Sequence, residues 1–352
     1  MGILDKLIDK DKTSQMTIAN PRDVFHQILK NSSGYATARD VKYNIFYQII
    51  AFKGVKDGVG VSTIVANTAI ALAELGLTVC VIDTSILYPT QDILLKTNME
   101  NYDKKDIVDW LDMPFTKASP LHVSSINKNI SVLGFYGKDR GIVDLLSTND
   151  SDSLVELAIT EFHNKFDIIL MDVCDEPTEV CAGCMQQSQK VIQVWNDSPQ
   201  VMGNINAFLT NWATLACPLD KMKNVVFSKL ARETMGANLD AVLEEYKLRK
   251  ITESYLDEDI YFHLATNKVL YQLESRDEDI IKYTDMIVDI VAHILNLNNL
   301  NKKVAKGTIT SQDIMDGKVE GTTTKKLKDR ADAQGYNTVV SPNSTDEMNF
   351  FE

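Results

Sequence analysis

Short apolar runs alternate with segments of helical apolar spacing from residue 43 onward. The apolar runs predict strands at 45–52, 78–83, 130–135, 166–172, 190–195 and 223–228. The helical spacing predicts helices at 62–75, 90–96, 104–111, 151–164, 200–213, 236–248 and 279–297. Several predicted strands are apolar throughout, which is typical of parallel strands covered by helices on both faces. The alternation therefore predicts one doubly wound α/β domain with a mostly parallel sheet over residues 43–298.

The two ends of the chain lack this alternation. Residues 1–42 form a polar N-terminal extension with two short apolar stripes, which predict surface helices packed on the core or, alternatively, docking helices. Residues 299–352 contain few large apolar side chains, so they cannot offset the entropy of ordering and are predicted to form a disordered tail. The last residues, 348–352, are interpreted as part of a free tail, with a partner-binding peptide as the alternative.

The charge of the chain bears on its partners. The net charge is −13, and an acidic folded body disfavours broad DNA binding, in which neutralising phosphates supplies most of the affinity. No apolar run reaches the length of a membrane-spanning helix. We therefore expect a cytoplasmic protein that reaches a membrane, if at all, through its partners.

Five cysteines, at positions 80, 174, 181, 184 and 217, form no even framework, which favours reduced thiols in a reducing compartment. Cys181 and Cys184 have the spacing of half a zinc site. One such pair supplies two of the four ligands, so the alternative is a metal shared across a symmetric dimer interface. Scattered reduced cysteines are the favoured interpretation.

A glycine-rich turn at residues 54–63 lies between the first predicted strand and the first predicted helix. Strand, glycine turn and helix in this order are the context of a phosphate-binding loop. The glycines let backbone N–H groups turn inward, and the helix N-terminus adds partial positive charge. A typical loop of this kind carries a lysine where this chain has Val61.

This loop resembles that of the ParA/MinD family of deviant P-loop ATPases, and within that family the chain looks most like the CpaE/TadZ branch, which helps place pilus and secretion machinery. The family pattern K-G-G-V-G-K-[ST]-[ST] aligns with Lys56-Asp57-Gly58-Val59-Gly60-Val61-Ser62-Thr63. Further similarity lies in the strand that ends at Asp83 and in the segment Phe166-Asp167-Ile168-Ile169-Leu170-Met171-Asp172. The resemblance implies a homodimer with ATP and Mg²⁺ as cofactors. It implies that Lys56 reaches across the dimer to the partner's nucleotide. It implies nucleotide binding by Lys56, Gly58, Val59, Gly60, Val61, Ser62 and Thr63, and Mg²⁺ binding by Ser62, Asp83 and Asp172.

The departures from the family pattern fall on the chemistry. Val61 replaces the loop lysine, Asp57 replaces a glycine, and Ser85 replaces the aspartate that helps activate the attacking water. Where the family often places an adenine-reading asparagine, the chain has Ser228-Lys229. We therefore expect no catalytic residue and a pseudo-ATPase that positions or scaffolds a larger assembly, such as pilus, secretion or conjugation machinery. The alternative is a slow ATPase with ATP-dependent dimerisation, including a partitioning role.

Overall fold

The computed structural model describes residues 47–85, 89–97, 121–134, 151–175, 178–215, 219–231, 237–255, 260 and 278–295. The N-terminal extension, the predicted helix at 104–111 and the tail lie outside these residues. The described part covers most of the predicted domain.

Eight strands of the described residues form one sheet in the order β3-β4-β2-β5-β1-β6-β7-β8. The strands are β1 (Ile49–Gly54), β2 (Val79–Asp83), β3 (His122–Val123), β4 (Ile130–Gly134), β5 (Ile168–Val173), β6 (Lys190–Trp195), β7 (Asn224–Leu230) and β8 (Arg249–Tyr255). All neighbouring pairs are parallel except β3 and β4. The predicted doubly wound, mostly parallel sheet is confirmed.

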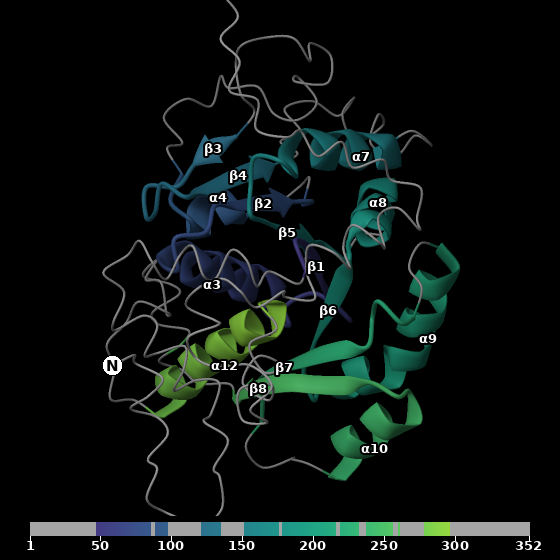
Figure 1. The fold of residues 1–352 in the computed structure, drawn as a ribbon. Helices are drawn as coiled ribbons and strands as arrows, with labels where there is room; N and C mark the ends of the chain where they lie inside the picture. The colour runs from purple at the N-terminus through teal and green to yellow at the C-terminus, as the bar shows by residue number, and fades with distance from the viewer. Residues whose placement is uncertain are drawn as a thin grey trace, which may run out of the picture.

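Helices cover both faces of this sheet (Figure 1). Their bounds are α3 (Val61–Glu74), α4 (Gln91–Leu94), α7 (Ser151–Phe162), α8 (Glu179–Gln187), α9 (Pro199–Leu215), α10 (Ala237–Glu245) and α12 (Glu278–Ile294). Helices α3 and α12 lie on one face, and α7, α8, α9 and α10 lie on the other (Figure 1). Among the described helices, none combines the length and apolar character needed to cross a membrane.

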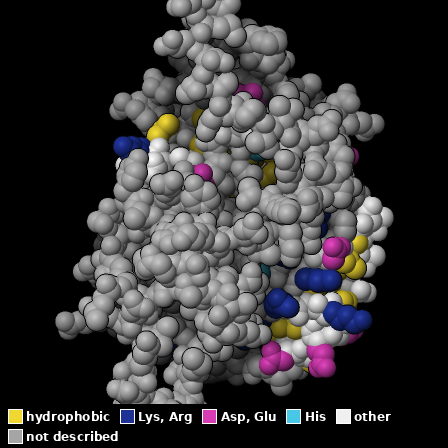
Figure 2. All heavy atoms as spheres, in the orientation of Figure 1, with side chains coloured by type: hydrophobic (Ala, Val, Ile, Leu, Met, Phe, Trp, Pro, Cys, Tyr) yellow, Lys and Arg dark blue, Asp and Glu magenta, His cyan; other side chains and the backbone are white. Residues whose placement is uncertain are grey.

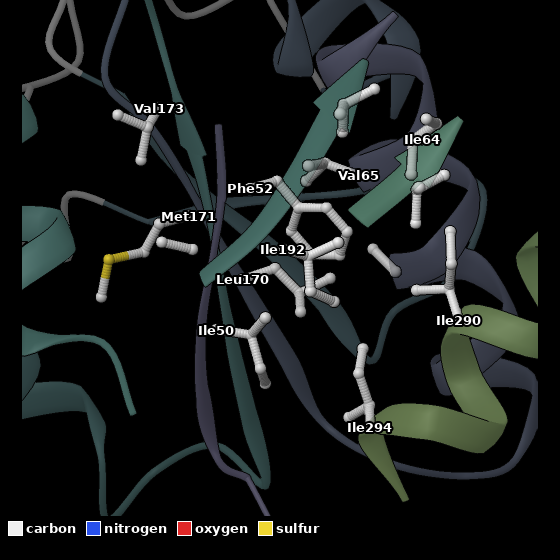
Figure 3. Close-up of a cluster of buried hydrophobic side chains, with 14 of the residues drawn as sticks. Ile50, Phe52, Ile64, Val65, Leu170, Met171, Val173, Ile192, Ile290 and Ile294 are labelled. Atoms are coloured by element: carbon white, nitrogen blue, oxygen red, sulfur yellow. The ribbon is translucent and has the colours of Figure 1, made fainter. Parts of the chain in front are cut away.

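The core explains why the central strands β1 and β5 are mostly apolar. Every residue of β1 and of β5 is buried. Phe52 and Leu170 point toward α3 and α12, where Ile64 and Ile290 meet them, whereas Met171 projects to the opposite face (Figure 3). Because both faces of the two central strands are covered, alternate residues are apolar on each side. Because β1 lies in the middle of the sheet, the position of the glycine turn that follows it is set by the core.

Four elements differ from the sequence expectation. The first strand was predicted at 45–52, but β1 extends to Gly54, so the glycine turn begins inside the strand. Strands β3 and β8 and helix α8 were not predicted. On the surface seen in Figure 2, basic and acidic side chains of the described residues intermingle over the sheet edge near α10 and β8. That mixed charge agrees with the charged, polar character of the β8 sequence.

Candidate nucleotide site

The glycine turn joins the end of β1 to the first turn of α3. Gly58 and Gly60 have φ angles of 79° and 101°, in the left-handed region that favours glycine. Gly60 is the N-cap residue of α3, and its carbonyl accepts a 3.0 Å hydrogen bond from the N–H of Ile64. The space around the missing side chain of Gly58 is open to 4 Å. The turn therefore presents backbone groups at a helix N-terminus, which is the arrangement that holds anions.

Val61 packs into the turn. A Cβ atom on Gly54 would lie 2.9 Å from Cγ2 of Val59 and 3.1 Å from Cγ2 of Val61, so both valines crowd the end of β1. Val59 is fully buried, and Val61 is a partly buried residue packed against the core. Val61 therefore stabilises the turn by apolar contact and brings no positive charge to it.

A lysine from another strand lies against the same turn. Nζ of Lys229, on β7, donates a 2.7 Å hydrogen bond to the carbonyl oxygen of Gly58. Lys229 has a φ of 58°, and the pairing of β7 with β8 shifts register between Phe227 and Leu230. A Cβ atom on Gly60 would lie 3.4 Å from Cε of Lys229, so the absent side chain leaves room for this lysine. Partial burial lowers the pKa of Lys229.

Sequence reasoning noted Lys229 only as a departure from an adenine-reading asparagine. Its approach to the turn depends on a left-handed backbone conformation near the end of β7, which no apolar periodicity signals. The lysine expected to reach a partner's nucleotide, Lys56, donates instead a 2.7 Å hydrogen bond to Oε1 of Gln200 on α9 of its own chain. The neighbouring Asp57 is exposed.

Two carboxylates lie side by side where β2 and β5 end. Asp83 and Asp172 are paired residues in the parallel register of these strands. Burial, followed by the negative charge of Asp172, raises the pKa of Asp83 to about 7, although hydrogen bonds from backbone N–H groups oppose both effects. Burial also raises the pKa of Asp172, and hydrogen bonds from Gln91 and Ser62 oppose the rise. The structure thus brings together the three predicted metal-binding residues, Ser62, Asp83 and Asp172.

Asp83 is oriented by backbone donors. Its Oδ2 accepts hydrogen bonds from the N–H groups of Thr90 at 2.8 Å and Gln91 at 2.9 Å, and its Oδ1 accepts one from Ser85 at 3.0 Å. The first two donors belong to the N-terminal end of α4. Ser85 therefore contributes a backbone donor to this network and a hydroxyl where the family places a carboxylate.

Gln91 is a site residue that sequence reasoning missed. Its side chain is fully buried, and Nε2 donates to Oδ2 of Asp172 at 2.7 Å and to the carbonyl oxygen of Ser62 at 3.0 Å. Within the described residues, Oε1 of Gln91 has no hydrogen-bond partner. The sequence carries no signal for Gln91, because its burial is seen only in the structure.

The donor set fits a nucleotide with Mg²⁺. Hydroxyl and carboxylate oxygens are the hard ligands that Mg²⁺ prefers, and Mg²⁺ is usually held by one or two carboxylates together with substrate phosphates. Accordingly, the described residues contain no group of three or more His, Cys, Asp and Glu side chains that could hold a metal alone. Among the described residues, the space beside Gly58 is open and Oε1 of Gln91 has no hydrogen-bond partner, which leaves room and polarity for a ligand.

The comparisons with known proteins agree with this geometry. Residues 46–134 match a ParA family model described as the NUBPL iron-transfer P-loop NTPase. The septum site-determining protein MinD of Helicobacter pylori (strain ATCC 700392 / 26695) is 32% identical over 125 residues, or 35% of this chain. The matched segment spans 43% of that relative's length. Residues 46–134 therefore resemble ParA-family P-loop NTPases.

Solved structures share the ParA/MinD fold at low identity. The MinC:MinD cell division protein complex of Aquifex aeolicus is matched with a TM-score of 0.53 and 19% identity, over 71% of this chain and 96% of that one. The septum site-determining protein MinD from Pyrococcus horikoshii OT3, complexed with Mg-ADP, is matched with a TM-score of 0.54 and 16% identity, over 72% and 98%. The chain therefore has the fold of these solved structures.

Proposed function

We propose that this ParA/MinD-type domain is a pseudo-ATPase, which binds ATP with Mg²⁺ without efficient hydrolysis and serves as a positioning or scaffold component of a larger assembly. The observation that carries the proposal is Val61, which packs against Gly54 in the turn where the family pattern has a lysine. Ser85 adds to it, because a serine stands where that pattern has a water-activating aspartate.

The energetics favour slow chemistry. Phosphoryl transfer depends mostly on positioning and on neutralising charge in the transition state. Removing one aimed donor typically costs roughly 3 kcal/mol of transition-state stabilisation, which is about a hundredfold in rate. Here a lysine and a carboxylate are both replaced, so hydrolysis is expected to be slow by several orders of magnitude.

Binding is supported by groups that the chain retains. The N-terminal turn of α3 supplies backbone donors, and Lys229 places an ammonium group 2.7 Å from the Gly58 carbonyl of the same turn. Ser62, Asp83 and Asp172 would hold Mg²⁺, which neutralises phosphate charge when bound. Lys229 thus supplies from β7 a positive charge that Val61 does not supply from the loop.

The scaffold role rests on the CpaE/TadZ likeness and on the kind of complex that a related fold forms. One of the matched structures is a complex of MinD with a second protein, MinC. We infer a homodimer with protein partners in a pilus, secretion or conjugation system. In a dimer, Lys56 would have to leave Gln200 in order to reach the partner's nucleotide.

A second candidate is a slow ATPase with ATP-dependent dimerisation, including a partitioning role. The observation that favours it is that Lys56 lies on the turn and is partly exposed. In this case Lys56 would replace the missing loop lysine across the dimer. An enzyme of this kind would lose its hydrolysis when Lys56 is replaced by alanine.

The test measures ATP binding by calorimetry, with and without Mg²⁺, and phosphate release. The wild type is compared with the variants Val61→Lys/Ser85→Asp, Lys56→Ala and Lys229→Met. We expect ATP binding by the wild type, no release above buffer level, and measurable release by the double variant Val61→Lys/Ser85→Asp. Wild-type release that Lys56→Ala abolishes would overturn the pseudo-ATPase in favour of the slow enzyme. Absence of binding at millimolar ATP would overturn the nucleotide-binding part, and Lys229→Met would then have no effect to measure.

A further inference from the structure

Two cysteine thiols lie in contact behind the nucleotide site. Cys174 follows the last residue of β5, and Cys181 is in the first turn of α8. Their Sγ atoms are 3.3 Å apart, within hydrogen-bond distance, and both cysteines are free. No helix was predicted at α8. The sequence analysis therefore interpreted Cys181 through its spacing to Cys184 and not through its contact with Cys174.

The surroundings of Cys181 favour a thiolate. Oγ1 of Thr178, the N-cap residue of α8, donates to Sγ of Cys181 at 3.3 Å, and Oγ1 of Thr84 lies 3.7 Å from the same sulfur. The helix N-terminus adds partial positive charge.

A buried cation lies beside the pair. The side chain of Lys53 is almost fully buried, and Nζ donates to the carbonyl oxygen of Cys174 and lies 3.2 Å from Oδ1 of Asp175. The ring of Trp212 covers the ammonium group at 5.1 Å from its centroid. Lys53 therefore holds the backbone of Cys174 in place and adds positive charge near both sulfurs.

The other described cysteines lack these features. Cys184 lies one helical turn after Cys181 and is fully buried, and burial is the main cause that raises its pKa. Cys80 is also fully buried, and burial raises its pKa. Cys174, in contrast, is partly exposed. The contact of two sulfurs and the access to one of them are therefore specific to Cys174 and Cys181 among the described cysteines.

We propose that Cys174 and Cys181 form a disulfide-forming site that reacts with low-molecular-weight disulfides of the glutathione class. In the first step the Cys174 sulfur, whose proton passes to solvent, attacks one sulfur of the external disulfide. A mixed disulfide forms and one external thiolate leaves. Cys181 then attacks the Cys174 sulfur, which forms the internal disulfide and releases the second thiolate. The two protein thiols lose two electrons, and one external disulfide becomes two thiols after taking up the two protons.

The geometry suits the second step. A disulfide bond is about 2.05 Å long, so the two sulfurs must approach by about 1.3 Å from their separation of 3.3 Å. The backbone N–H of Cys174 donates to Oγ1 of Thr84 at 2.9 Å, and this hydrogen bond holds the backbone of Cys174, the more exposed of the two cysteines, in place. The attack is therefore a small movement between two positioned side chains.

The test is a titration of the purified full chain in glutathione buffers from reducing to oxidising, followed by alkylation of free thiols and peptide mass spectrometry. We expect a single internal disulfide between Cys174 and Cys181, in the wild type and in the variants Cys80→Ser, Cys184→Ser and Cys217→Ser. Cys181→Ser should stop at a glutathione adduct on Cys174. Cys174→Ser should leave Cys181 unmodified, since Cys181 is buried.

Three results would overturn the proposal. The first is that Cys174 and Cys181 stay alkylatable across the whole buffer range. The second is that Cys184→Ser prevents the disulfide as completely as Cys181→Ser does. The third is an adduct on Cys174 in the wild type that Cys181 never resolves. Each variant is first checked for folding by its circular dichroism, and none of these outcomes depends on nucleotide binding.

Discussion

The side-chain amide of Gln91 donates a 2.7 Å hydrogen bond to the Asp172 carboxylate, and both groups are buried at the ends of neighbouring elements. The same nitrogen donates to the carbonyl oxygen of Ser62. An NH₂ group therefore lies between two oxygen-bearing residues that the family uses around Mg²⁺. In the absence of a cation, Gln91 offsets part of the cost of burying Asp172.

Replacing Gln91 by methionine should therefore make the domain more dependent on Mg²⁺ for its stability. Without Mg²⁺, Gln91→Met should lower the free energy of unfolding by about 1–3 kcal/mol, because a buried carboxylate loses a donor. With 10 mM Mg²⁺ and ATP present, the loss should shrink. Urea denaturation in both buffers measures it, and Gln186→Met, at an exposed position of α8, is the matched control. An equal loss in both buffers would contradict the prediction.

Restoring the loop lysine should strengthen ATP binding. Val61→Lys is expected to lower the Kd for ATP about tenfold, because a charge-assisted contact to phosphate replaces an apolar contact inside the turn. The control Val61→Ala removes the same packing against Gly54 and adds no charge. Calorimetry at one Mg²⁺ concentration compares both variants with the wild type. If Val61→Ala binds as tightly as Val61→Lys, the effect is one of packing.

Lys229 should account for part of the remaining affinity. Lys229→Met keeps the length of the side chain and removes its charge, so the Kd for ATP should rise roughly tenfold. Lys250→Met is the control, since Lys250 is exposed and pairs with Glu253 on β8. The salt dependence of binding should also fall in Lys229→Met alone. An unchanged Kd would remove Lys229 from the site.

Acid should destabilise the domain through His293 on α12. Burial, followed by the charges of Lys190 and Arg249, lowers the pKa of His293 to about 4. Below pH 6.5 the unfolded chain takes up a proton at this position and the folded domain does not. The contribution of neutral His293 to the free energy of unfolding is therefore fully present above pH 6.5 and falls as the pH falls toward 4.

The expected loss between pH 7 and pH 5 is about 2 kcal/mol at this residue, from roughly 1.4 kcal/mol per pKa unit. The variant His293→Gln should lack this part of the loss. Urea denaturation at the two pH values measures the difference between wild type and variant. His163→Gln, at a partly exposed position, should behave as the wild type does. Parallel pH dependence in His293→Gln and the wild type would refute the assignment.

Apolar periodicity predicts the buried strands and most helices of this domain because burial on one or both faces dictates those residues. It misses β8 at the sheet edge, whose sequence Arg-Lys-Ile-Thr-Glu-Ser-Tyr is polar except for Ile251 and Tyr255. It also misses α8, a nine-residue helix with a small apolar face. In both cases the signal is weak because little apolar surface is buried.

The residues of the candidate site likewise divide into those that the sequence predicted and those that it did not. Ser62, Asp83 and Asp172 were implied by the resemblance to the ParA/MinD family, and the structure brings them together because Asp83 and Asp172 lie in register on neighbouring parallel strands. Gln91 and Lys229 were not implied, because their positions depend on the start of a short helix and on one left-handed residue. Cys174 and Cys181 come together only when β5 and the unpredicted α8 are in place.

The central position of β1 has a consequence for synthesis on the ribosome. Ile49 pairs with Ile169, and Ile50 pairs with Lys190, so the strand before the glycine turn lies 120 and 140 residues upstream of its neighbours. At about 5–20 residues per second, translation needs on the order of 10 s to supply them. During that interval β1 lacks both of the strands that it pairs with, so the nascent chain is a natural client for a chaperone that shields apolar segments.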